Sequence, residues 1–144
     1  MVWLTRENSG MNGMTENRIV LDTNAVIFLT TRGSIVPADL QDELNEAELF
    51  ISVITEIELF AKPAMLPDEE EKLRTFIMER IPVIDLTGDV KKETIVLRRT
   101  TALKLPDCIV AATAIVQNAI LLTADKKLLS LSRPGYSVKS LNGK

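Results

Sequence analysis

The stretch Ile19–Asn24, which reads IVLDTN, decides the fold that this sequence predicts. Its first three residues form a short apolar run of strand character, of the kind found in sheets that are buried on both faces. An aspartate follows the run directly, so the Asp22 side chain should emerge at the carboxyl edge of a central strand. In α/β proteins, that edge is where ligands bind.

Further apolar runs repeat this pattern at residues 49–53, 81–86, 120–122 and 137–141. Longer segments separate them, and the clearest helical patterns lie at 37–47, 53–61, 67–79, 88–102 and 106–118. Strands that alternate with helices favour a parallel sheet joined by right-handed crossovers. The sequence therefore predicts an α/β fold of three layers, α/β/α, with a central and mostly parallel sheet of about five strands.

One predicted helix is unusually apolar. From Cys108 to Val116 only Thr113 interrupts a run of hydrophobic residues. A helix that is apolar almost all round should lie between the sheet and another layer, for which a second subunit is one candidate.

Length and composition indicate a single domain. The chain has 144 residues, enough to bury a core without a disulfide or a structural metal, and only 4% of them are aromatic. Aromatic platforms for stacking nucleic-acid bases are therefore not expected. Residues 18–144 are predicted to form the domain, and residues 1–17, which are polar and turn-rich, are predicted to be a disordered extension.

The missing side chains exclude several kinds of chemistry. The chain has no histidine, and Cys108 is its only cysteine, which excludes histidine-based triads, metal-free ribonucleases that depend on histidine, and an internal disulfide. The lone cysteine and the lack of a secretory or membrane-spanning segment indicate a cytoplasmic protein. Because the net charge is −3, contacts with nucleic acid must come from a local patch or from metal ions.

Three aspartates stand where a parallel sheet places ligands. Asp22 follows the first strand, Asp125 follows the run at 120–122 in the same way, and Asp107 begins the apolar helix. Each also suits a structural role, because aspartate caps helix N-termini and is favoured in the first turn. For any one of them alone, the sequence leaves both roles open.

A fourth acid lies on the helix predicted to follow the second strand. Glu56 and Glu58 point about 200° apart on a helix, so only one of them can face the sheet edge. Periodicity does not decide between them. Glu58 also fits a capping box that begins at Thr55, which would be a structural role.

Taken together, these acids predict a metal site. Carboxylates that meet at one sheet edge repel one another and raise each other's pKa unless a cation neutralises them. Oxygen ligands select a hard cation, Mg²⁺ or Mn²⁺, and such ions can activate water for attack on a phosphodiester.

Four segments of the chain together resemble the motifs of the PIN domain, and most closely those of the VapC toxins of type II toxin–antitoxin systems. The segments are IVLDTN (19–24), ISVITEIEL (51–59), LPDCIVAATA (105–114) and LTADK (122–126). The resemblance extends over about residues 18–141. It implies a PIN-like fold and an acidic catalytic and metal-binding set made of Asp22, Glu58, Asp107 and Asp125.

The same resemblance decides what periodicity could not, since the family's glutamate directly precedes a leucine, as Glu58 does here. It also implies that Asn24 and Thr123 support the acids through hydrogen bonds. It further implies endonucleolytic cleavage of RNA that depends on Mg²⁺ or Mn²⁺, a homodimer, and inhibition by a cognate antitoxin that covers the active site.

Basic residues near the acids are candidates for contact with RNA phosphates. Lys104, Lys126 and Lys127 are close in sequence to two of the aspartates. A second basic cluster, on the helix predicted at 88–102, is more simply a solvated face; it consists of Lys91, Lys92, Arg98 and Arg99.

Two other functions compete with the nuclease. The phosphohydrolases of the haloacid-dehalogenase type also carry an aspartate after the first strand, but they need a second aspartate where this chain has Asn24. A non-catalytic module that binds RNA or protein is the stronger alternative, because a fold does not fix a function. Such a module has no need for four carboxylates that repel one another.

Overall fold

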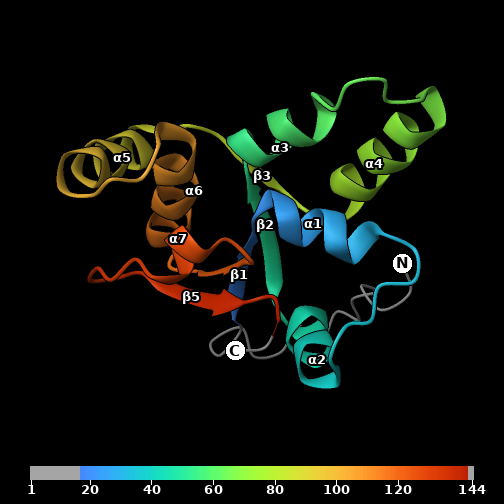
Figure 1. Cartoon of the computed structure of the whole chain (residues 1–144), viewed down its shortest axis with the longest axis horizontal. Coiled ribbons are helices and arrows are strands. Elements are labelled where there is room, and N and C mark those ends of the chain that lie inside the picture. The colour runs from blue at the N-terminus through green and yellow to red at the C-terminus, as the bar shows by residue number, and fades with distance from the viewer. Residues whose placement is uncertain (1–16, 143–144) are drawn as a thin grey trace.

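The computed structural model describes residues 17–142 and contains a five-stranded sheet in the order β3-β2-β1-β4-β5 (Figure 1). Every pair of neighbouring strands is parallel. The strands are β1 (Arg18–Leu21), β2 (Glu48–Ser52), β3 (Val83–Ile84), β4 (Ile120–Thr123) and β5 (Ser137–Ser140). The predicted α/β class is confirmed, and a strand lies in each predicted region.

Helices connect these strands along the chain. They are α1 (Thr23–Thr30), α2 (Ala38–Glu46), α3 (Val53–Phe60), α4 (Pro67–Arg80), α5 (Gly88–Thr100), α6 (Leu105–Val116) and the short α7 (Lys126–Leu129). The predicted helices correspond to α2, α3, α4, α5 and α6, with ends that differ by one or two residues.

The two faces of the sheet carry separate cores, because successive side chains on a strand point to opposite faces. In β1, Ile19 and Leu21 belong to one core and Val20 to the other, and none of the three is more than 2% exposed. Residues of α1, α2, α3 and α4 complete the first core, and residues of α5, α6 and α7 complete the second. The predicted three-layer architecture is confirmed.

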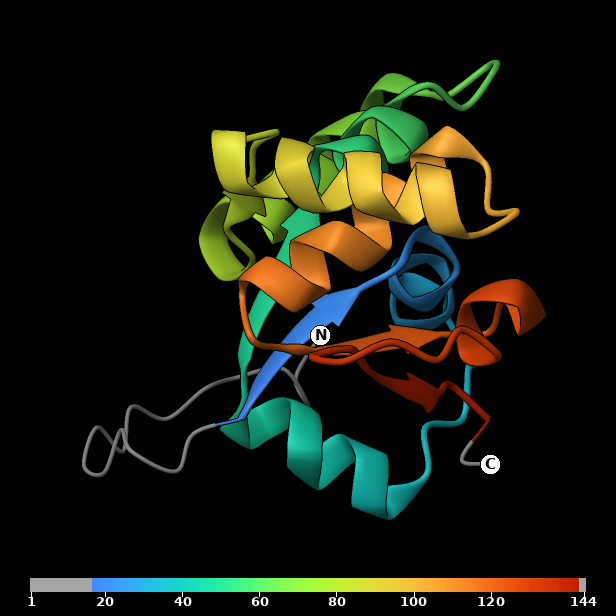
Figure 2. The ribbon, with the colours of Figure 1, turned by 90° about the vertical axis from the view of Figure 1, so that its left-hand side faces the viewer.

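The apolar helix α6 lies between the sheet and α5 (Figure 2). All seven residues from Cys108 to Ala114 are buried, in agreement with the pattern seen in the sequence. The layer outside α6 is therefore another helix of the same chain, so a second subunit is not needed to bury it.

Helix α1 was not among the predicted helices. Its sequence, TNAVIFLT, is apolar on most sides and rich in β-branched and aromatic residues, so it has no helical period to detect. Burial of Ala25, Val26 and Leu29 against the sheet stabilises this helix, although its local sequence does not predict one.

The extension predicted to be disordered, residues 1–17, lies outside the described residues except for Asn17. The Asn17 carbonyl accepts a hydrogen bond of 2.9 Å from the Glu48 amide, so it continues the pairing of β1 with β2. Within residues 17–142, no helix has both the length and the apolar character that a bilayer crossing requires.

Candidate metal centre

The sheet has a topological switch point between β1 and β4. From β1 the chain proceeds outward to β2 and β3 and then returns to the other side of β1 to form β4 and β5. Connections therefore leave the carboxyl ends of β1 and β4 in opposite directions, and ligands of α/β proteins bind at such a point. Leu21 pairs with Leu122 in the register, so the residues that follow them, Asp22 and Thr123, lie side by side.

Asp22 is held firmly at this edge. The residue is only 7% exposed, and its carboxylate accepts hydrogen bonds from the Thr23 amide at 2.8 Å, the Asn24 side-chain amide at 3.2 Å and the Thr123 hydroxyl at 2.7 Å. Asp22 is also the N-cap of α1. The two roles that the sequence left open are thus compatible, because the helix that Asp22 caps begins at the sheet edge.

Asn24 and Thr123 tie the ends of the two central strands together. The Asn24 side-chain oxygen accepts a hydrogen bond from the Ala124 amide at 2.9 Å, and the Thr123 hydroxyl oxygen accepts one from the Asp125 amide at 3.0 Å. The hydrogen bonds are those that a supporting role would use, and that role toward the site stays a prediction. They connect the backbone that carries Asp125 to the side chain of Asp22.

Asp125 occupies the N-cap of α7, where its Oδ1 accepts a hydrogen bond from the Lys127 amide at 2.8 Å. The capping role considered for this residue is therefore present. Its other carboxylate oxygen has no hydrogen bond within the described part of the chain, which leaves it free for a ligand.

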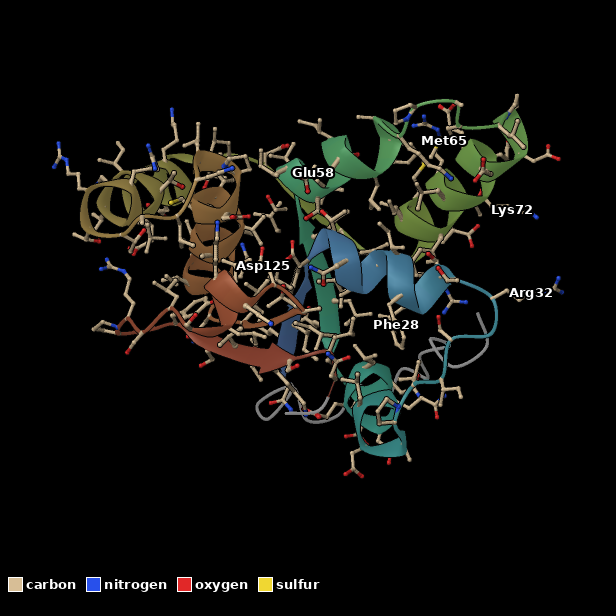
Figure 3. All side chains as sticks on the ribbon, viewed as in Figure 1. Phe28, Arg32, Glu58, Met65, Lys72 and Asp125 are labelled. Carbon is tan, nitrogen blue, oxygen red and sulfur yellow. The ribbon has the colours of Figure 1, made fainter. Side chains whose placement is uncertain are left out.

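Glu58, rather than Glu56, reaches the first turn of α1. The Thr23 hydroxyl donates a hydrogen bond of 2.5 Å to Glu58 Oε1. The capping box proposed for Thr55 and Glu58 does not form, because α3 begins at Val53 and Ser52 caps it. Figure 3 shows Glu58 on α3 and Asp125 at the start of α7, on either side of the first turn of α1.

Asp107 lies in the first turn of α6. Although aspartate is favoured at such a position, it does not cap the helix, since α6 begins after Lys104 without a side-chain cap. Hydrogen bonds lower the pKa of Asp22, whereas none lowers the pKa of Asp107. The position of Asp107 is thus set by α6 itself, and its side chain is half-buried.

Electrostatic interactions show that the four acids form one cluster. Burial raises the pKa of Asp22, and the charges of Glu58 and Asp125 raise it further against the lowering effect of its hydrogen bonds. Burial also raises the pKa of Asp107, and the charges of Asp125, Asp22 and Glu58 add to that effect. The sequence analysis predicted this mutual repulsion, and we call these residues the acid cluster.

The chemistry of the acid cluster fits a hard divalent cation. All of its ligand atoms are carboxylate oxygens, and several of them have no hydrogen-bond partner in residues 17–142. Within residues 17–142, no three or more aspartate, glutamate, cysteine or histidine side chains are placed so that together they could hold a metal ion. Mg²⁺ keeps several waters and takes only one or two carboxylates directly, so it does not require such a group.

Among the predicted RNA contacts, Lys127 has a charge that acts on the acid cluster. It lowers the pKa of Asp107, against the raising effects of burial and of the other three acids. Lys104 is the N-cap of α6, three residues before Asp107, and Lys104 and Lys126 are exposed. In the second basic cluster, Arg98 donates a hydrogen bond of 2.6 Å to the Leu103 carbonyl. That contact anchors the loop before α6.

Two residues of the site were not singled out from the sequence. Thr23 lies within the motif IVLDTN but was not singled out there, and it contacts both Asp22 and Glu58. Tyr136 donates a hydrogen bond of 2.7 Å to the Leu128 carbonyl, and burial together with the charges of Asp22 and Asp125 raises its pKa. Only the order of β4, α7 and β5 in space reveals Tyr136, because nothing in its local sequence marks it.

A groove adjoins the acid cluster at Glu58. It has a volume of about 610 Å³ and lies between α1, α3 and α4. Its apolar lining comes from Ile27, Leu59, Met65, Leu73 and Phe76. Lys62, Glu69 and Lys72 also line it, and Lys62 and Glu69 form an ion pair at 2.9 Å. Met65 and Lys72 are on the far side of Glu58 from Asp125 (Figure 3). The groove therefore extends from Glu58 at the acid cluster along a mainly apolar lining.

The fold and the acidic switch point define a class of α/β protein with a parallel sheet and a cluster of carboxylates at the carboxyl ends of its central strands. The family model for the PIN domain matches residues 19–134. The chain thus belongs to the PIN-domain family, and the resemblance seen in the four motifs is confirmed.

Solved structures with a similar fold include several toxin–antitoxin complexes. A chain of a toxin–antitoxin complex from Klebsiella pneumoniae is 26% identical with a TM-score of 0.62, over 82% of this chain and 94% of that one. A chain of VapBC2 from Rickettsia felis bound to a promoter DNA fragment is 21% identical with a TM-score of 0.68, over 85% and 97%.

A chain of DNA-bound VapBC from Salmonella typhimurium is 21% identical with a TM-score of 0.67, over 87% of this chain and 98% of that one. None of the curated proteins matches this sequence.

Proposed function

We propose that this PIN domain is a metal-dependent endoribonuclease and the toxin of a VapBC-type toxin–antitoxin pair. One observation carries the nuclease proposal: carboxylates from four separate elements interact electrostatically at the switch point of the sheet. Negative charges held this close together repel one another, and a bound cation would neutralise that repulsion. The similarity to chains of toxin–antitoxin complexes supports the assignment to that system.

Asp22, Glu58, Asp107 and Asp125 would hold the cation, and Asn24 and Thr123 would keep Asp22 and the Asp125 backbone in place. A bound Mg²⁺ or Mn²⁺ would supply an activated water and neutralise charge on the phosphate under attack. Lys104, Lys126 and Lys127 would contact neighbouring phosphates of the RNA. Because the chain has no histidine, these carboxylates are also its available bases near the site.

The partner follows from the groove beside Glu58. An apolar groove that opens toward an acidic cluster suits a segment of a protein that carries apolar residues and a basic residue. We propose a cognate antitoxin as that protein. A segment lying in the groove would end at Glu58 and block access of RNA to the acid cluster.

The decisive experiment is cleavage of a mixed pool of structured RNAs by the antitoxin-free protein, with Mg²⁺ or Mn²⁺ and with EDTA. Asp107→Asn is the variant of choice because it removes a charge without removing a hydrogen bond. Asp89→Asn is its matched control, since Asp89 is an exposed acid in the first turn of α5. We expect metal-dependent cleavage by the wild-type chain and by Asp89→Asn, and none by Asp107→Asn.

The principal alternative is a PIN-like module that binds RNA or protein without cutting. Absence of both cleavage and divalent-metal binding would favour that module. Metal binding without cleavage would instead indicate that the RNA pool lacks the target.

The homodimer and the cytoplasmic location are proposed on family membership alone. Sedimentation of the antitoxin-free protein tests the first of these, and a stable monomer at micromolar concentration would contradict it.

A further inference from the structure

We infer that Thr23 is a positioning residue for Glu58: its hydroxyl holds the glutamate carboxylate against the acid cluster and thereby sets the affinity of the cluster for a divalent cation. The inference deepens the proposed function and rests on it, because it assigns a role toward the same cation. It concerns a residue that has no charge and would not itself bind the metal.

Thr23 contacts two members of the acid cluster through two different groups. Its backbone amide donates to Asp22 Oδ1 at 2.8 Å, and its hydroxyl donates to Glu58 Oε1 at 2.5 Å. The first contact is the ordinary cap of α1 and any residue at this position could make it. The second requires a side-chain donor, so it depends on threonine or serine.

Glu58 is the member of the cluster that most needs such a contact. Asp22 is buried and accepts three hydrogen bonds, Asp125 is fixed by its cap, and Asp107 has a short side chain. Glu58 is exposed and has a longer side chain, which loses more rotamer entropy when it is fixed. Its hydrogen bond with Thr23 is the only one it makes within residues 17–142.

Repulsion within the cluster works against this placement. The negative charge of Glu58 raises the pKa of both Asp22 and Asp107, so the glutamate is pushed away from them when no cation is present. The free rotamers of an exposed glutamate include many that point to solvent. A donor on α1 that reaches across to α3 favours the rotamer directed at the cluster, and residues of this kind typically change metal affinity by about 10- to 100-fold.

The test combines four variants with the full chain: Thr23→Val, Thr23→Ser, Glu58→Ala and the double variant Thr23→Val/Glu58→Ala. Valine matches the shape of threonine and lacks the hydroxyl, whereas serine keeps it. Thr100→Val is the matched control, because the Thr100 hydroxyl is exposed and bonds only to the Val96 carbonyl within α5. The readouts are the dissociation constant for Mn²⁺ alone and the midpoint of thermal unfolding in EDTA.

We expect Thr23→Val to weaken Mn²⁺ binding about tenfold, and Thr23→Ser and Thr100→Val to stay within about twofold of the wild type. In the Glu58→Ala background, Thr23→Val should cause no further loss. A residue that only maintained the fold would weaken binding in both backgrounds. That result, or equal weakening by valine and serine, would overturn the inference.

The metal-free measurement separates this inference from the proposed function. Thr23→Val should lower the unfolding midpoint by about 1–4 °C when Glu58 is present and not when it is alanine. An equal shift in both backgrounds overturns the role of Thr23 whatever the metal result. Failure of the wild-type chain to bind Mn²⁺, with the coupled thermal shift intact, overturns the proposed function and leaves the contact between Thr23 and Glu58 standing.

Discussion

The Thr123 hydroxyl donates a hydrogen bond of 2.7 Å to Asp22 Oδ2, and this contact joins the carboxyl ends of the two central strands. Thr123 is fully buried and Asp22 is nearly so. The same hydroxyl oxygen accepts a hydrogen bond from the Asp125 amide, so one side chain serves two members of the acid cluster.

Replacing Thr123 with valine should therefore destabilise the fold. The substitution leaves a buried carboxylate oxygen with one donor fewer and the Asp125 amide without its acceptor, which together cost about 1–3 kcal/mol. Urea unfolding at neutral pH measures the loss. Thr123→Ser keeps the hydroxyl and should retain most of the stability. A valine variant as stable as the wild type would show that the contact contributes nothing.

A second prediction concerns Asp107 and pH. Its pKa is raised in the folded chain above the ordinary value of 3.8, chiefly by burial and then by the neighbouring acids. The folded chain therefore binds a proton more readily than the unfolded chain does. The contribution of Asp107 to the free energy of unfolding is unfavourable at neutral pH and becomes less so as the pH falls toward about 4.

Asp107→Asn should consequently be more stable than the wild type at pH 7 in EDTA, and the advantage should shrink between pH 7 and about 4. Denaturant titrations at several pH values give the difference directly. Asp89→Asn, which removes an exposed acid from the first turn of α5, should show no such trend. An advantage of Asp107→Asn that grows with acidification would contradict the assigned direction.

A third prediction places the RNA path beside Lys127. Because this lysine lies within electrostatic range of Asp107, Lys127→Gln should weaken RNA binding at all sequences and reduce the dependence of log affinity on log salt by about one unit. Binding is measured in the Asp107→Asn background, so that the RNA is not cut. Lys91→Gln, on the exposed face of α5, is the control, and an equal effect of both variants would remove the distinction between the two basic groups.

The sequence predicted the centre of the sheet well because β1, β2 and β4 are short, mainly apolar runs whose side chains are buried on both faces. It predicted Asp22 and Asp125 because strand ends in a parallel sheet meet at one edge. It could not choose between Glu56 and Glu58 by periodicity, since the choice depends on the position of Thr23 on α1. Helix α1 was itself missed, because its burial on several sides removes the periodic signal.

The sequence left open whether each aspartate caps a helix or belongs to a functional site, and in the structure one residue can do both. Asp22 and Asp125 each cap a helix and each belong to the acid cluster. Both helices start at the sheet edge, so a carboxylate that satisfies their first amides stands beside the switch point. Asp107 is different, because it lies in the first turn of α6 without capping it.

Asp125 allows the two roles to be separated by experiment. Asparagine caps helices about as well as aspartate, so Asp125→Asn should keep the cap on the Lys127 amide while losing one negative charge from the cluster. Asp125→Ala loses both, and its fold should be about 1 kcal/mol less stable than that of Asp125→Asn. If the charge is what the function needs, both variants lose Mn²⁺ binding and RNA cleavage although only alanine weakens the fold. Full cleavage by Asp125→Asn would reduce this residue to a helix cap and confine the cation to Asp22, Glu58 and Asp107.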